Sequence, residues 1–322
     1  VAVADSDAKA TSVSEDSGAS VLAVARSDAN ANVDSVASAT SDVSATGIAT
    51  HDSNVNIAAG AGSVANAGYG SSSTAKSDVN VWGAATDHSD VNVEVVALSD
   101  AEALIGSDAD ATSILHVDAA ADHHSDTTVL ALSNSDANAI GFSTADAIAN
   151  LDLRAEAEKH SSVTVDNSFA SATANGILAS DADARATGGL AVHATDHSTI
   201  DANVQSTAFA DTFIGDASSE STAIVLAPSV DHYSDLDINA KANSIAVGLL
   251  GGDATSDSVA VAGAIVTDHS DATVSSLADA ESLAAVFHSA AASAAAGAGA
   301  IVDDWSSAIS NAVSHATDIE TP

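Results

Sequence analysis

The sequence repeats a cluster of residue types that can carry chemistry. Thr86-Asp87-His88-Ser89-Asp90 recurs unchanged at Thr267-Asp268-His269-Ser270-Asp271, and Thr195-Asp196-His197-Ser198-Thr199 is a near copy. Aspartate, histidine and serine are the members of a hydrolytic triad, but a triad converges from separate elements and needs only one copy. Neighbours on one short segment usually point apart. The repetition therefore indicates a role in a repeated unit and argues against a catalytic site.

Carboxylates and imidazoles at a regular spacing are also metal ligands. Carboxylate oxygens suit calcium, whereas imidazole nitrogens suit zinc or nickel. Neither the EF-hand pattern nor the glycine-rich nonapeptide calcium repeat is present. A corner turn, in which Asp and Ser side chains bond nearby backbone amides, is therefore the favoured interpretation, with a calcium site as the functional alternative. The candidate metal ligands are Asp87, His88, Asp90, Asp122, His124, Asp126, Asp196, His197, Asp231, His232, Asp268, His269 and Asp271.

Seven histidines mark an internal repeat of about 36 residues. After most of them the chain alternates apolar and polar residues, as in Val91-Asn92-Val93 and Val163-Thr164-Val165, which is the period of a half-buried strand. After two of them, His51 and His232, the alternation slips by one residue, which predicts a one-residue insertion in the turn. The seven are His51, His88, His124, His160, His197, His232 and His269.

A second series of turns lies in the middle of each repeat, at Ile105-Gly106, Ile140-Gly141 and Ile214-Gly215. Strands of Val, Ile and Ala that recur at a fixed period between polar corners predict an all-β fold, a parallel β-solenoid or β-helix of about 36-residue repeats. Helical repeats would need apolar residues at i, i+3, i+4 and i+7, which these segments lack. Small inward residues favour two short coils of about 18 residues per repeat over one wide coil.

The alternation also predicts which side chains face inward. We expect the following residues to be buried: Val91, Val93, Val129, Val163, Val165, Ile200, Ile238 and Val274. We expect these residues to be exposed: Asn92, Thr128, Thr164, Asp201 and Asp237.

The repeat divides the chain into residues 1–280, the β-solenoid, and residues 281–322. The second part holds a last half-coil and a small-residue stretch at 289–300. Trp305, Ile309 and Val313 then follow at a spacing of four. That spacing predicts a short helical or irregular cap, or a joint to the next subunit.

The charge balance limits the partners. The chain has 45 acidic and 7 basic residues, a net charge of −38, so it repels nucleic acid and anionic membranes. The expected partners are divalent cations and copies of the same chain. No apolar run reaches the roughly 18 residues of a membrane span. The first residue is Val1, not Met, which a removed secretory signal or a fragment would explain.

Degenerate repeats rich in Val, Ala, Asp, Ser and Thr, with strand alternation over residues 1–280, resemble the repeat regions of secreted bacterial filamentous adhesins and other β-solenoid surface fibres. The resemblance implies an extracellular, elongated and non-enzymatic protein. We expect a structural subunit of a self-assembling filament, surface fibre or adhesin stalk. The alternative is a calcium- or surface-binding module, and the third possibility is a carbohydrate-active β-helix enzyme.

Overall fold

A computed structural model describes residues 1–178, 180–250, 252–285, 289–303 and 305–321. They form two parallel sheets of nine strands each, and no helix occurs in these ranges. The odd-numbered strands make one sheet: β1 (Ala2–Glu15), β3 (Val36–Thr50), β5 (Ser72–Thr86), β7 (Asp108–Asp122), β9 (Thr144–Glu158), β11 (Asp181–Thr195), β13 (Ala217–Val230), β15 (Ala254–Val266) and β17 (Ala290–Val302). The even-numbered strands make the other: β2 (Gly18–Ala31), β4 (Asn54–Ala67), β6 (Asp90–Ala103), β8 (Asp126–Ile140), β10 (Ser162–Ile177), β12 (Thr199–Thr212), β14 (Asp235–Gly248), β16 (Asp271–Ala285) and β18 (Ser307–Thr321).

The predicted parallel β-solenoid is confirmed, but its coil is one wide turn of about 36 residues. Each strand pairs with the strand two places along, so that Val36 lies beside Ser72 and Ser72 beside Asp108. The prediction of two 18-residue coils per repeat is wrong. Small inward residues set the distance between the two sheets, and they do not limit how long each strand runs before it turns.

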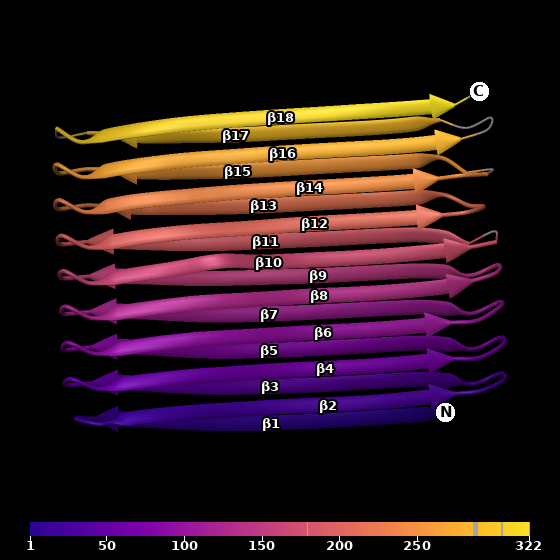
Figure 1. Ribbon diagram of the computed structural model, residues 1–322, viewed down its shortest axis with the longest axis horizontal. Helices are drawn as coiled ribbons and strands as arrows, with labels where there is room; N and C mark the ends of the chain where they lie inside the picture. The colour runs from indigo at the N-terminus through magenta and orange to yellow at the C-terminus, as the bar shows by residue number, and fades with distance from the viewer. Residues whose placement is uncertain (179, 251, 286–288, 304, 322) are drawn as a thin grey trace.

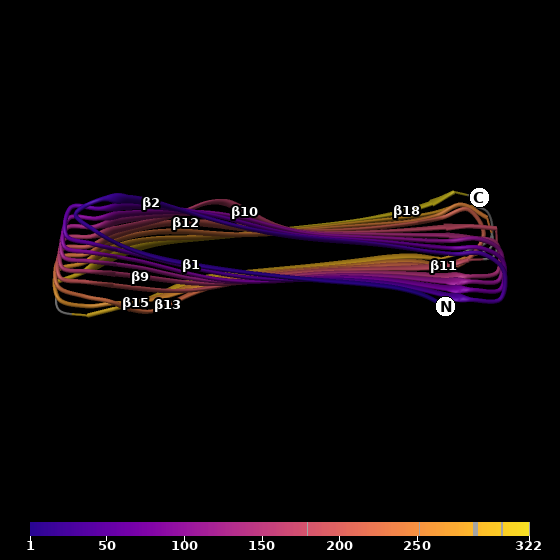
Figure 2. The same ribbon diagram turned by 90° about the horizontal axis from the view of Figure 1, so that it is seen from below.

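The resulting shape is a flat, twisted slab and not a slim rod (Figures 1 and 2). Strands of 13 to 16 residues at about 3.3 Å per residue make the slab about 50 Å wide. Nine coils stacked at about 4.8 Å make it about 40 Å tall along the solenoid axis. The two sheets face each other across one thin interior.

Strands β17 and β18 lie where the sequence predicts a short helical or irregular cap, or a joint to the next subunit. They extend the two sheets by parallel pairing with β15 and β16. Ile309 and Val313 lie four residues apart on β18, and an even spacing places both on the same face of a strand as readily as on one face of a helix. The spacing of four was therefore ambiguous. Trp305 lies in the turn before β18, with a φ of 65°.

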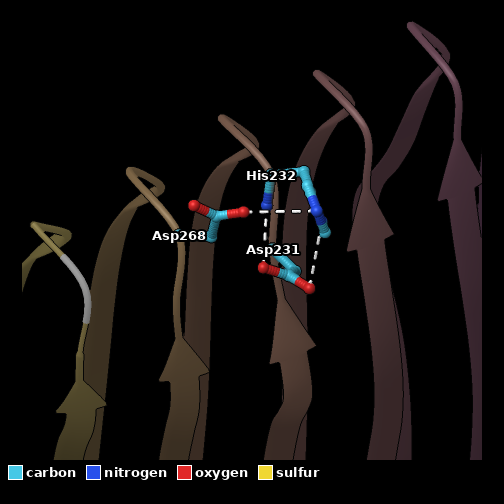
Figure 3. Close-up of side chains that lie close together, drawn as sticks. All are labelled: Asp231, His232 and Asp268. Atoms are coloured by element: carbon cyan, nitrogen blue, oxygen red, sulfur yellow. Dashed lines mark hydrogen bonds and ion pairs between the residues drawn. The ribbon is translucent and has the colours of Figure 1, made fainter.

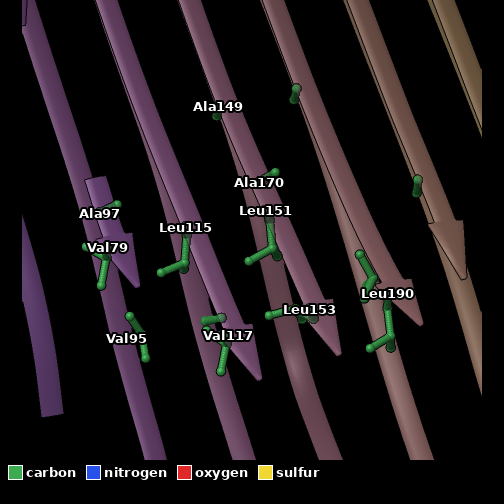
Figure 4. Close-up of a cluster of buried hydrophobic side chains, with 14 of the residues drawn as sticks. Val79, Val95, Ala97, Leu115, Val117, Ala149, Leu151, Leu153, Ala170 and Leu190 are labelled. Atoms are coloured by element: carbon green, nitrogen blue, oxygen red, sulfur yellow. The ribbon is translucent and has the colours of Figure 1, made fainter. Parts of the chain in front are cut away.

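The interior is formed by the alternation that the sequence predicts. All eight predicted inward residues are at most 3% exposed. The predicted outward residues face solvent, and of these Thr164 is half-buried. The larger side chains gather in the middle coils, where Leu115, Leu151 and Leu190 fill the space between the sheets (Figure 4).

Two different edges close the slab, where the chain crosses from one sheet to the other. Turns from an odd strand to the following even strand lie at the left of Figure 1. Those between β3 and β16 make up the histidine edge: residues 51–53, 87–89, 123–125, 159–161, 196–198, 232–234 and 268–270. Turns from an even strand to the next odd strand lie at the right and make up the apolar edge: residues 32–35, 68–71, 104–107, 140–143, 177–178 and 180, 213–216, and 249–250 with 252–253.

Candidate functional site

The histidine edge is built from a turn with two consecutive residues in the left-handed region. In the turn between β5 and β6, Asp87 has a φ of 56° and His88 a φ of 62°. Asp, Asn and His tolerate this region better than most residues. The same pair of positive φ values recurs in the other turns of this edge, for example at Asp196 and His197. The repeated Asp-His therefore has a backbone reason, which supports the corner-turn interpretation.

The serine that follows each pair is a structural residue. Ser89 is buried, and its Oγ accepts a hydrogen bond from the backbone N–H of Ser53, one coil earlier, at 3.3 Å. The next coil repeats the bond, from the N–H of Ser89 to the Oγ of Ser125 at 3.2 Å. The same column continues through Ser161, Ser198, Ser234, Ser270 and Ser306. A hydroxyl used in this way is not available as a nucleophile.

The second residue of each pair forms a column of stacked rings. His88 and His124 lie 5.1 Å apart between ring centroids and are within 2° of parallel. The column continues from His124 to His160 at 5.0 Å and from His160 to His197 at 4.8 Å. Tyr233 follows at 5.1 Å, and His269 follows Tyr233 at 4.9 Å.

His51 and His232 do not belong to the ring column, because each occupies the first position of its pair. The turns keep the same length, so the predicted one-residue insertion is wrong. The serine column gives the correct phase, since its members recur every 36 or 37 residues. It assigns Asp52 and Tyr233 to the ring position, and sequence reasoning missed Tyr233 because it aligned the repeats on histidine.

Basic and acidic residue types alternate in part at the first position of the pairs, and some of the basic ones contact carboxylates beside the turn. Lys159 reaches back to Asp122, with Nζ at 3.2 Å from Oδ1, and His123 lies 2.9 Å from the same carboxylate. Burial raises the pKa of Asp122, but the hydrogen bonds from Lys159 and His123 outweigh it, and the net pKa is lowered. His51 lies 3.8 Å from Asp87 in the next coil.

One cluster brings three of the predicted ligands together (Figure 3). The Nδ1 atom of His232 lies 3.1 Å from Asp231 Oδ2, and its Nε2 atom lies 3.2 Å from Asp268 Oδ2 in the next coil. One ligand atom from each of the three residues lies within 4.8 Å of the others. Both ring nitrogens of His232 therefore face carboxylates. The arrangement offers one imidazole and two carboxylates to a cation.

The remaining acidic ligands lie in a separate row. Asp90, Asp126 and Asp271 are the first residues of β6, β8 and β16, on the outer face of the even-numbered sheet. Asp90 pairs in register with Asp126, and Asp235 with Asp271. Burial raises the pKa of Asp90, and the charge of Asp126 raises it further. The candidate ligands of each repeated Asp-His-Ser-Asp turn thus lie apart, with the histidine in the ring column and the last aspartate in an acidic row.

A further acidic row lies on the odd-numbered sheet, near the apolar edge. Asp110 pairs with Asp146, and Asp146 with Asp183, along three successive strands. Burial raises the pKa of both Asp110 and Asp146, and neighbouring carboxylates add to it. Stacking one coil on the next therefore brings like charges together wherever the same acidic residue recurs.

The comparisons with known proteins identify no relative: no family model, no curated protein and no solved structure matches the chain. In the part of the chain that the structure describes, no helix is long and apolar enough to cross a membrane.

Proposed function

We propose that this chain is a structural segment of an extracellular surface fibre, a β-solenoid that keeps a fixed shape and stacks on copies of itself. The supporting observation is the uninterrupted parallel pairing of β1 through β17 in one sheet and β2 through β18 in the other. The seven turns of the histidine edge repeat the same pair of positive φ values, and the strands between them enclose the same thin interior. A function that resides in the repeat as a whole is mechanical, because it needs length and stiffness and no single specialised coil.

Stacking between copies uses the strand edges at the two ends of the solenoid. Within the described sheets, β1 and β17 each pair on one side only, as do β2 and β18. Open strand edges template pairing with another chain. The inward positions of both outer odd strands are small, with Ala4 and Ala8 on β1 and Ala294 and Ala296 on β17 packing against the core. Two such ends can meet without steric conflict.

The test places a charge on the inner or the outer face of the same end strand. Ala296→Lys adds an inward charge to β17, and Ala295→Lys adds the same charge on the adjacent outward position. We expect the wild-type chain and Ala295→Lys to form elongated stacks in electron micrographs at about 0.15 M salt, where charge repulsion is screened beyond about 8 Å. Ala296→Lys should stay as single slabs. A wild-type chain that never stacks, at any salt or calcium concentration, would contradict the proposal.

A second candidate function, cation binding, is favoured by the cluster of Asp231, His232 and Asp268. A donor set of one imidazole and two carboxylates suits zinc better than calcium, which prefers oxygen ligands throughout. Binding to the folded state would raise the melting temperature in proportion to the logarithm of the metal concentration. Melting with zinc, with calcium and with a chelator tests it. Asp268→Asn should remove the response, whereas Asp257→Asn, on the outer face of β15, should leave it unchanged.

A further inference from the structure

The apolar edge exposes large apolar side chains in every turn between Val33 and Leu250. The most exposed is Phe142, at 77%, and each of the others exposes more than a third of its surface. The set is Val33, Tyr69, Leu104, Ile105, Ile140, Phe142, Ile177, Leu178, Phe213, Leu249 and Leu250. Soluble chains rarely expose a contiguous apolar patch of this kind without a partner for it.

The fold itself does not require apolar residues at this edge. Residues with positive φ, such as Gly70 and Gly106, determine the backbone of these turns. Ser71 and Ser107 also hold it, because their Oγ atoms accept hydrogen bonds from backbone N–H groups of the preceding coil. Asp34 occupies a positive-φ position of the first turn. Phe142 also has a positive φ, of 54°, which is unfavourable for a bulky side chain. Local folding therefore gives no reason for an exposed phenylalanine there.

The same edge is where the chain is least charged. The described residues of four consecutive turns, from Gly68 to Ser180, include no Asp, Glu, Lys or Arg, whereas the three outer turns of the edge carry Asp34, Asp216 and Asp253. The whole chain has a net charge of −38, and on the histidine edge each turn carries at least one ionisable side chain. Another copy of this chain therefore meets the least repulsion at the apolar edge. An anionic membrane would still be repelled by the rest of the molecule, and salt has to screen the same repulsion between the remaining surfaces of two copies.

The exposed area is large enough for a specific contact. Eleven large side chains, each exposed by between 37% and 77%, leave on the order of 900 Å² on one copy. A standard interface buries about 800 Å² on each partner. The edge can also pair with itself, because the turn with Phe142 is the middle one of the seven turns named above, which are those that the structure describes. A two-fold axis through that turn would bring Phe142 of one copy against Phe142 of the other, at the centre of the contact.

We propose that two copies of this chain pair side by side along the apolar edge, with Phe142 at the centre of the interface. The proposal goes beyond stacking at the ends of the solenoid, because it uses a different surface. Pairing gives a slab about 100 Å wide in the strand direction, twice the width of one copy. In a fibre, it would join two stacks laterally.

The experiment measures the dimer by sedimentation velocity and its shape by small-angle scattering. Leu104→Asp and Phe142→Asp are the edge variants. The matched control is Leu130→Asp on β8, because Leu130 is 44% exposed, as is Leu104, but lies on a sheet face. We expect a wild-type dimer of doubled width, dimerisation weakened roughly tenfold or more by each edge variant, and no change for the control. Circular dichroism establishes that each variant is folded.

Three outcomes would overturn the proposal. They are a wild-type chain that stays monomeric over the whole concentration range, a control that dissociates as readily as the edge variants, and a monomer that instead floats with phosphatidylcholine vesicles. Ala296→Lys separates the two kinds of assembly. It blocks stacking at the ends and should leave the side-by-side dimer intact, so failure of either proposal can be recognised independently.

Discussion

The hydroxyl oxygens of Ser63 on β4 and Ser77 on β5 lie 3.1 Å apart across the interior between the two sheets. Both side chains are buried, at 1% and 0% exposure. Equivalent serine pairs occur in neighbouring coils, at Ser27 with Ser41 and at Ser99 with Ser113. These hydroxyls also bond to backbone carbonyls, so they form a satisfied polar seam through an otherwise apolar core.

We predict that Ser77→Ala destabilises the fold by about 1 kcal/mol, because it removes the partner of a buried hydroxyl. Ser258 provides the matched control. It is equally buried on β15, and its Oγ has no hydrogen-bond partner among the described residues. Ser258→Ala should therefore be neutral or slightly stabilising. Urea denaturation of the two variants measures the difference, and equal losses would show that the seam contributes no net stability.

Two glycines should respond in opposite directions to the same substitution. A Cβ atom at Gly47 would lie 2.6 Å from Val55 Cγ1 and 2.7 Å from Ile57 Cδ1 in the core. Gly47→Ala should therefore cost about 1–3 kcal/mol by overpacking. A Cβ at Gly62, which faces outward on β4, would meet no atom within 4 Å. Gly62→Ala should stabilise by about 0.5–1 kcal/mol, because glycine loses more backbone entropy on folding. Thermal melting of both variants tests the pair.

The acidic rows predict how stability changes with pH. Burial raises the pKa of Asp146 above its ordinary value of 3.8, and the charge of Asp183 adds to this. The folded state therefore takes up this proton before the unfolded state does, and stability gained from Asp146 increases as pH falls from neutral towards about 3.8. Asp146→Asn should raise the melting temperature modestly at pH 7 and flatten this part of the pH profile.

Asp122 is the control, because its pKa shift has the opposite sign: Lys159 and His123 lower its pKa despite burial. The ionised Asp122 carboxylate stabilises the folded state above pH 3.8, the ordinary pKa. This stabilisation is lost as the pH falls through the lowered pKa of the folded state. Asp122→Asn should therefore lower the melting temperature at pH 7. If both Asn variants shifted the melting temperature in the same direction, charge at these two sites would not be the cause.

Substitutions at His160 can separate its backbone role from its ring. The residue has a φ of 63° and stacks between His124 and His197. Both Ala and Gly remove the ring, but only Gly adopts the left-handed region without a steric penalty, which is about 1–2 kcal/mol for other residues. We expect His160→Gly to be about 1 kcal/mol more stable than His160→Ala in urea denaturation. Equal stability would mean that the turn relaxes around alanine.

The sequence was sufficient to predict the fold class and the inward face of the strands. Val91 and Val93 alternate with Asn92, and this period fixes which side chains are buried whatever the length of the coil. The period could not distinguish one coil per repeat from two, because a turn after 14 residues looks the same whether the next strand joins the same sheet or the opposite one. That choice depends on pairing between distant residues, such as Ser72 with Asp108.

The sequence predicts the candidate site less well than the fold, because histidine does not keep a fixed position in each repeat. His232 and Tyr233 show the difficulty: the backbone requires two left-handed residues followed by a buried serine, and it accepts several side chains at the two left-handed positions. The charge contacts of His232 with Asp231 and Asp268 depend on side-chain placement across two coils. No spacing within one repeat contains that information.

The fit of Gly47 against Ile57 has a consequence for how the chain folds. A chain that repeats its pattern every 36 residues offers each strand several incorrect partners, one or more whole coils away, with the same alternation. Such mispairing keeps every apolar residue inside and conserves the turns, so the repeat alone penalises it weakly. The missing side chain of Gly47 matches the bulk of Ile57 and Val55 when β3 lies over β4. One coil on, Gly83 takes the same place in β5, but two coils on, Ala119 replaces the glycine in β7, so the match disfavours a shift of two coils. Gly188 against Val204 Cγ1 is a second such match, between β11 and β12. Differences in the size of inward side chains from coil to coil thus favour pairing of each strand with its native partner during folding.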